Sequence, residues 1–132
     1  MRVVLDTNVF ISGIFWSGEC NEIIMKWKEG KFILVTSLEI ISELVKVLDS
    51  FKIQLPKERI KEWANMIIRN SIITEPKEKF NIIKDDPKDD LFVETAFSGK
   101  AYYLVTYDNH LLKLKEFKDI KIITPAEFLK LL

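Results

Sequence analysis

The chain has 132 residues, of which 48% are hydrophobic and 30% charged, proportions typical of one folded domain and not of a disordered chain. Its 20 basic and 20 acidic side chains leave no net charge, which excludes binding to nucleic acid through an overall positive field. The single cysteine excludes an internal disulfide, and no apolar run approaches the ~20 residues that cross a bilayer. We therefore expect one cytoplasmic domain over residues 1–132. The scarcity of glutamine beside abundant Lys, Glu and Ile is typical of a thermophile.

Short apolar runs alternate with helical patterns along the chain. The first run, 2–5, does not alternate with polar residues, as expected of a strand buried on both faces. Further strands are predicted at 32–35, 72–73, 102–105 and 120–123, and helices at 20–29, 37–49, 57–70, 91–98 and from 126 onward. This alternation indicates an α/β fold, with a central parallel sheet of four to five strands covered by helices on both faces.

Proline and glycine mark the expected helix ends. Pro56 and Pro125 each stand where a helix can begin at its first position. Gly30 and Gly99 each follow a helical stretch, where a left-handed residue commonly ends the helix.

The first strand ends on Asp6, followed by Thr7 and Asn8. Ligands bind at the carboxyl ends of strands in open parallel sheets, so Asp6 is a candidate functional residue. The alternative is helix capping, in which the carboxylate accepts hydrogen bonds from free backbone N–H groups. Thr7 and Asn8 are ordinary loop residues or, alternatively, hold the carboxylate in one rotamer.

The second predicted helix carries Glu43. Thr36 and Glu39 have the spacing of a capping box, which gives Glu39 a structural role. Glu43 has no such role, and its neighbour one turn back is the apolar Ile40, so its stem is expected along the protein-facing margin of the helix. A surface pair with Lys46 is the alternative.

A run of aspartates precedes the fourth predicted helix, in the sequence IIKDDPKDDLFVETAF. Acidic residues here satisfy helix-start chemistry, but four of them exceed that need. Asp86, Asp90 and Glu94 are spaced by four and share one helix face. Asp90 directly precedes the apolar residues of the helix and is the one expected to point toward the sheet edge. Asp86 and Asp89 are supporting candidates.

Asp108 follows the strand of the sequence YLVT and heads a short predicted helix, so capping is again the alternative to a functional role. His110, the only histidine, is a candidate proton donor, metal ligand or phosphate contact, or else a plain surface or capping residue.

If Asp6, Glu43, Asp90 and Asp108 converge, their mutual repulsion requires a bound cation or bound protons. Oxygen ligands of this kind select Mg²⁺ or Mn²⁺. The chemistry indicated is phosphodiester hydrolysis, with a metal-activated water as the nucleophile.

The chain resembles the PIN-domain family, the nuclease fold of VapC-like toxin components of toxin–antitoxin systems. The resemblance runs over nearly the whole chain, in the segments LDTNVFIS, SELVKVL, DPKDDLFVETA, YLVTYDNHLL and KIITPAEFL. It implies a three-layer α/β/α domain whose acids are Asp6, Glu43, Asp90 and Asp108, with Asn8 and Thr106 in supporting places. His110 stands where relatives often carry a further acid.

The resemblance also implies Mg²⁺- or Mn²⁺-dependent cleavage of single-stranded RNA, a homodimer and a cognate antitoxin. Lys84, Lys88, Lys113 and Lys115 flank the later acidic motifs and are candidate phosphate contacts, or else ordinary surface lysines. Trp16 is a candidate for the groove or for a dimer interface.

Two other functions fit parts of this sequence. A strand-end aspartate also serves aspartyl-phosphate phosphotransfer enzymes, but Asn8 stands where their second aspartate is expected, and no lysine follows a late strand as they require. A non-catalytic PIN-type module that binds RNA or protein is the second alternative. Such modules usually lack one or more of the acids, whereas this chain keeps all four.

Overall fold

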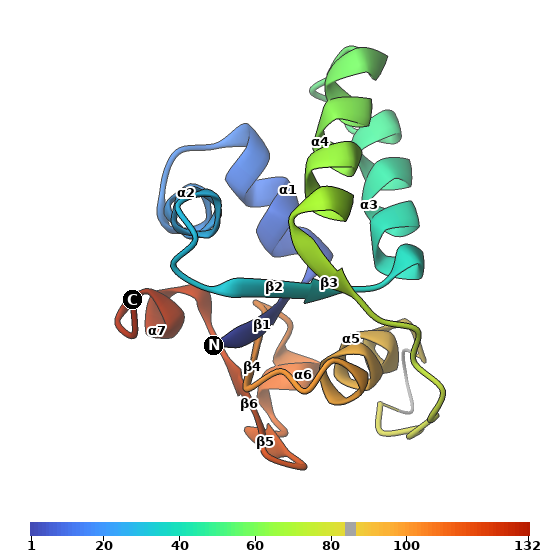
Figure 1. Cartoon of the computed structure of the whole chain (residues 1–132), viewed down its shortest axis with the longest axis vertical. Coiled ribbons are helices and arrows are strands. Elements are labelled where there is room, and N and C mark those ends of the chain that lie inside the picture. Colours follow the sequence, from blue (N-terminus) through green and yellow to red (C-terminus); the bar gives the residue numbers. More distant parts are fainter. Residues whose placement is uncertain (84–86) are drawn as a thin grey trace.

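The structure, a computed structural model, describes residues 1–83 and 87–132 and contains a single mixed sheet within them (Figure 1). Its strands follow the order β3-β2-β1-β4-β6-β5, in which all neighbours are parallel except β5 and β6. The bounds are β1 (Arg2–Leu5), β2 (Ile33–Thr36), β3 (Ser71–Ile73), β4 (Tyr103–Val105), β5 (Glu116–Phe117) and β6 (Ile120–Ile123). The predicted α/β class is confirmed. The predicted parallel sheet of four to five strands is confirmed as well, since five strands are parallel to one another, and the antiparallel two-residue β5, which was not predicted, adds a sixth strand beside β6.

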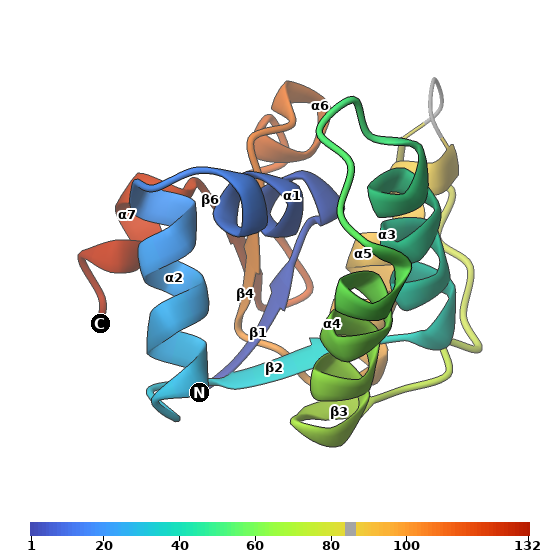
Figure 2. The same ribbon diagram turned by 90° about the horizontal axis from the view of Figure 1, so that it is seen from above.

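Helices cover both faces of the sheet and complete three layers (Figures 1 and 2). The apolar side chains of β1 alternate between two cores: Val3 and Leu5 pack with residues of α1 to α4 and α7, and Val4 packs with residues of α5 and α6. The helices are α1 (Thr7–Phe15), α2 (Glu19–Lys28), α3 (Leu38–Ser50), α4 (Lys57–Arg69), α5 (Pro87–Ser98), α6 (Asn109–Leu112) and α7 (Pro125–Leu129). In the described ranges, none of them has the length and apolar character that a bilayer span requires.

Helix α1 was not among the predicted elements. Its sequence, TNVFISGIF, is rich in β-branched residues and contains a glycine, so local propensity does not favour a helix. Packing against α2 supplies the missing stabilisation, and the glycine permits it. A Cβ on Gly13 would lie 2.4 Å from Cδ1 of Ile24 and 2.7 Å from the carbonyl oxygen of Cys20.

The cap of α3 differs from the predicted one. Thr36 is the last residue of β2, and the helix is capped instead by Ser37, whose hydroxyl accepts the backbone N–H of Ile40 at 3.2 Å. The expected capping box of Thr36 and Glu39 is therefore wrong by one residue. Glu39 lies in the first turn, where its charge favours the positive end of the helix dipole.

Of the two prolines and the two glycines that were predicted to mark helix ends, one of each does so as expected. Pro125 begins α7 at its first position, and Gly30 has a φ of +77°, as expected after a helix. Pro56 is the residue before α4, and after α5 the left-handed residue is Lys100, with a φ of 55°. Gly99 serves a different purpose there, because a Cβ on it would lie 2.3 Å from Cγ1 of Val35.

Candidate active site

The candidate site lies at the carboxyl ends of β1 and β4, the two central strands. From β1 the chain passes to β2 and β3 on one side, whereas β4 continues to β6 on the other side. The position between the carboxyl ends of β1 and β4 is therefore the topological switch point of the sheet, where open α/β sheets bind ligands. Asp6 directly follows β1, and Thr106 directly follows β4.

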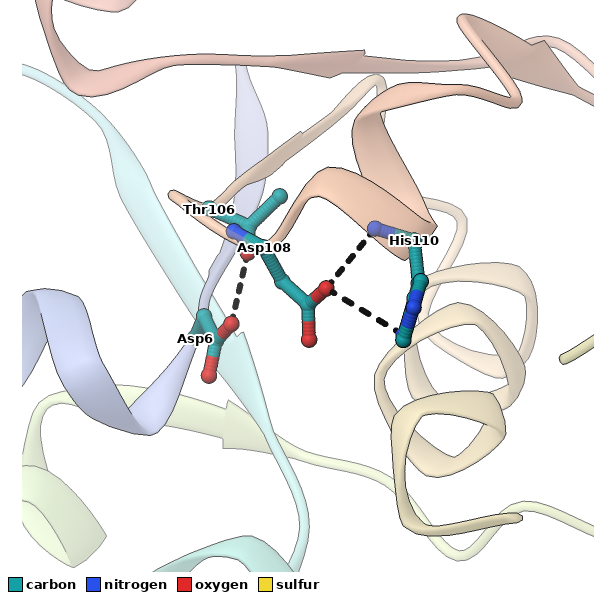
Figure 3. A network of polar contacts seen from close by, with 4 residues as sticks. All are labelled: Asp6, Thr106, Asp108 and His110. Carbon is teal, nitrogen blue, oxygen red and sulfur yellow. Dashed lines mark hydrogen bonds and ion pairs between the residues drawn. The ribbon is translucent and has the colours of Figure 1, made fainter. Parts of the chain in front are cut away.

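Thr106 joins two of the predicted acids through one hydroxyl group (Figure 3). Its Oγ1 donates to Oδ2 of Asp6 at 2.6 Å and accepts the backbone N–H of Asp108 at 2.9 Å. Because the amide of Asp108 can only donate, the threonine proton is directed at the Asp6 carboxylate. Thr106 is fully buried, so this arrangement is shielded from competing water.

Asp6 is itself buried, with 5% of its surface exposed. Its Oδ1 accepts the backbone N–H of Asn8 at 3.4 Å as the cap of α1, so Asp6 does cap this helix. The supporting contact from Asn8 comes from its backbone amide, and its side chain lies on the surface.

Burial raises the pKa of Asp6 above the ordinary aspartate value. The hydrogen bonds from Thr106 and Asn8 act in the opposite direction, and the negative charges of Asp108 and Glu43 raise the pKa further. A carboxylate in these surroundings is stabilised by taking up a proton or by a nearby cation. The environment of Asp6 is therefore suited to binding a positive ion.

Asp108 lies between the Asp6 side and the His110 side of the site (Figure 3). It is half-buried and caps α6, its Oδ1 accepting the backbone N–H of His110 at 2.8 Å. The Nδ1 atom of the same histidine lies 3.9 Å from this oxygen. His110 is more than half exposed, so its ring stands on the solvent side of the site.

Asp89 is a further acid of the site and lies close to Asp108 and His110. One potential ligand atom from each of these residues lies within 4.8 Å of the other two. Asp89 is buried, with 7% of its surface exposed. The sequence predicted Asp89 only as a supporting candidate. Which of the two adjacent aspartates faces the site depends on the rotation of α5 about its axis, and tertiary packing sets that rotation.

Asp90 is buried as well, but its carboxylate is engaged on the segment before α5. Its Oδ1 accepts the backbone N–H groups of Ile82 at 3.1 Å and Ile83 at 2.8 Å. One turn later, Oε2 of Glu94 accepts the N–H of Phe80 at 3.1 Å. The shared face of Asp90 and Glu94 thus holds the backbone of residues 80–83. Asp86, the third member predicted for this face, lies outside the described residues.

Glu43 is half-buried on α3 and lines a groove of about 490 Å³ between α3 and the start of α5. Lys46 and Lys88 line the same groove. The negative charge of Glu43 also raises the pKa of Asp6, and Glu43 is the one of the four predicted acids that lines this groove. No ion pair links Glu43 to Lys46 in the part of the chain that the structure describes.

Comparisons with known proteins agree with this architecture. A family model described as "PIN domain" matches residues 2–110. An uncharacterized protein of Methanocaldococcus jannaschii, MJ1680, is 29% identical over 147 residues, covering 98% of this chain and 90% of its own length.

Two solved structures share the fold. The VapBC2 structure from Rickettsia felis, bound to a promoter DNA fragment, matches with a TM-score of 0.63 at 16% identity, covering 94% of this chain and 98% of that one. The VapBC-1 structure from nontypeable Haemophilus influenzae matches with a TM-score of 0.65 at 18% identity, covering 96% of this chain and 99% of that one.

Proposed function

The chain belongs to the PIN domain family, and from this premise we propose that it is a divalent-metal-dependent endoribonuclease that cleaves single-stranded RNA. We further propose that it is the toxin of a toxin–antitoxin pair and works as a homodimer. The observation that carries the proposal is the buried Asp6 carboxylate, whose pKa is raised by burial and by the charges of Asp108 and Glu43. Such a group favours a cation at the switch point of the sheet.

The donor groups at this place fit Mg²⁺ or Mn²⁺. Carboxylate oxygens are the preferred protein ligands of both ions, and the only cysteine of the sequence, Cys20, contacts the Tyr107 hydroxyl and is not part of the acidic cluster. The ligands that we propose are Asp6, Glu43, Asp90 and Asp108, and the geometry adds Asp89 and His110 as candidates. When bound, a divalent ion supplies an activated water and stabilises charge on the phosphate oxygens.

The protein's own residues position and protect this chemistry. Thr106 fixes the rotamer of Asp6 and ties it to the backbone of Asp108, so two ligands from different strands keep one geometry. We propose that His110, on the exposed side of Asp108, contacts a phosphate of the incoming strand. The groove beside Glu43 is lined by Glu39 as well as by Lys46 and Lys88, and we propose Lys46 as a contact for a neighbouring phosphate.

The proposed partner has support from the shared fold. The matching structures from R. felis and H. influenzae are both VapBC structures, and the chain is similar to them over nearly its full length. A cognate antitoxin is therefore the protein partner that we propose for this chain.

The test is cleavage of a fluorescent single-stranded RNA in the presence of Mg²⁺, Mn²⁺ or EDTA. We expect wild-type cleavage with either metal ion and none with EDTA. Asp6→Asn and Asp108→Asn should each reduce the rate by at least about a hundredfold, since each removes a charged ligand. Glu62→Gln is the matched control, because this carboxylate is exposed on α4.

A second readout follows the metal without activity. Mn²⁺ should raise the melting temperature of the wild type, and the rise should disappear in Asp6→Asn. Cleavage that persists in EDTA and in both variants would refute the metal-dependent mechanism. A wild type that cleaves no RNA in a library of random sequence would refute the nuclease proposal.

A further inference from the structure

Tyr107 stands between two residues of the site and is tied to a distant helix. It follows Thr106 and precedes Asp108, so its Cα lies about 3.8 Å from the Cα of each. Its hydroxyl donates to Oε1 of Glu19 at 2.6 Å, and Sγ of Cys20 lies 3.2 Å from the phenol oxygen. Glu19 and Cys20 are the first two residues of α2.

The Tyr107 side chain is held both at its backbone and at its hydroxyl. The buried Thr106 anchors the backbone, and the two partners on α2 hold the hydroxyl. The residue nevertheless keeps 44% of its surface exposed. Among the stacked and edge-on aromatic pairs found in the described residues, none includes Tyr107. The ring is therefore an immobilised aromatic surface beside the site, with little rotamer entropy left to lose on binding.

We propose that Tyr107 is a stacking platform for a nucleobase next to the scissile phosphate. This inference rests on the proposed function. An aromatic ring suits this place because it can bind RNA without carrying a charge. The neighbouring carboxylates of Asp6 and Asp108 repel a polyanion, and a lysine at this position would compete with the metal ion for those same carboxylates. Stacking adds affinity without charge and accepts any base, since every base has a flat face.

The hydrogen bonds of the Tyr107 hydroxyl to α2 have a structural role that is separate from stacking. They set the orientation of the ring, but the ring itself makes the contact. Tyr107→Phe therefore removes these hydrogen bonds and keeps the platform, and Tyr107→Ala removes both. Tyr102 offers a matched control, because it is also exposed, at 63%, but precedes the amino end of β4, whereas the site lies at the carboxyl end.

The experiment uses a set of 5′-fluorescein RNA 12-mers, each cleaved by the wild type at one known bond. One nucleotide at a time, on either side of that bond, is replaced by an abasic residue, and KM and kcat are measured with Mn²⁺. For the wild type, we expect one abasic position to raise KM by about tenfold, within the range of base–aromatic stacking. Tyr107→Ala should raise KM by a similar factor on intact RNA and be insensitive to that abasic position.

Tyr107→Phe should keep the abasic penalty, and Tyr102→Ala should match the wild type throughout. Melting curves of all variants verify that each is folded under the assay conditions. An abasic profile that Tyr107→Ala leaves unchanged, while cleavage persists, would overturn the stacking role and leave the nuclease proposal standing. A wild type without RNA cleavage would overturn both.

Discussion

Asp90 offers a sharp test of how the segment before α5 is held. Its buried Oδ1 accepts two backbone N–H groups, from Ile82 and Ile83. Each hydrogen bond to a charged group contributes about 1.5–3 kcal/mol, and removing the acceptor also leaves buried donors without partners. Asp90→Ala should therefore lower the free energy of unfolding by about 4 kcal/mol. Asp90→Asn keeps an acceptor oxygen but loses the charge, and it should cost about 2 kcal/mol.

Urea unfolding followed by circular dichroism measures these losses. With a slope near 2 kcal/mol per molar, the midpoint of Asp90→Ala should fall by about 2 M. The measurement is made in EDTA, so that any role of Asp90 as a metal ligand does not contribute. Glu62→Ala is the control, since its exposed pair with Arg59 contributes under ~0.5 kcal/mol. A midpoint for Asp90→Ala within ~0.5 M of the wild type would refute the anchoring role.

Two further changes test the site and the packing of α1. Because the pKa of Asp6 is raised in the folded protein, the metal-free wild type should lose stability as the pH rises from the ordinary aspartate pKa through the raised one. Asp6→Asn should not lose stability over this pH range, and in EDTA at neutral pH it should melt at a higher temperature than the wild type. A lower melting temperature than that of the wild type would contradict the raised pKa of Asp6. Gly13→Ala should destabilise by about 2–3 kcal/mol, because its Cβ would meet the backbone carbonyl of Cys20. Ser12→Ala is the control in urea unfolding. If Gly13→Ala had the same midpoint as this control, α1 and α2 could move apart to accommodate the Cβ without loss of stability.

The parallel sheet was predictable because burial on both faces leaves a strong signal. Val3, Val4 and Leu5 are apolar without alternation, and the structure sends them to opposite cores. Helix α1 carried no comparable signal. It forms because Gly13 lets α2 approach closely, a tertiary contact that local propensity does not contain.

The site shows the same division. Residues that directly follow strands, such as Asp6 and Thr106, could be placed at one edge from strand order alone. The aspartates of α5 could not, because adjacent helix positions differ by about 100° and the sequence does not fix the phase. The helix begins at Pro87 and not at Leu91, and its packing directs Asp90 to the backbone of residues 80–83.

The two margins of the sheet limit how copies of this chain can associate. On one side β3 has three residues, and on the other β5 has two and bears the exposed Glu116. Strands this short, one of them charged, give another chain almost no backbone to pair with, which is how natural sheets avoid edge-to-edge aggregation. The homodimer that we propose should therefore form through its helices, and its far-ultraviolet spectrum should gain no strand signal when two copies associate.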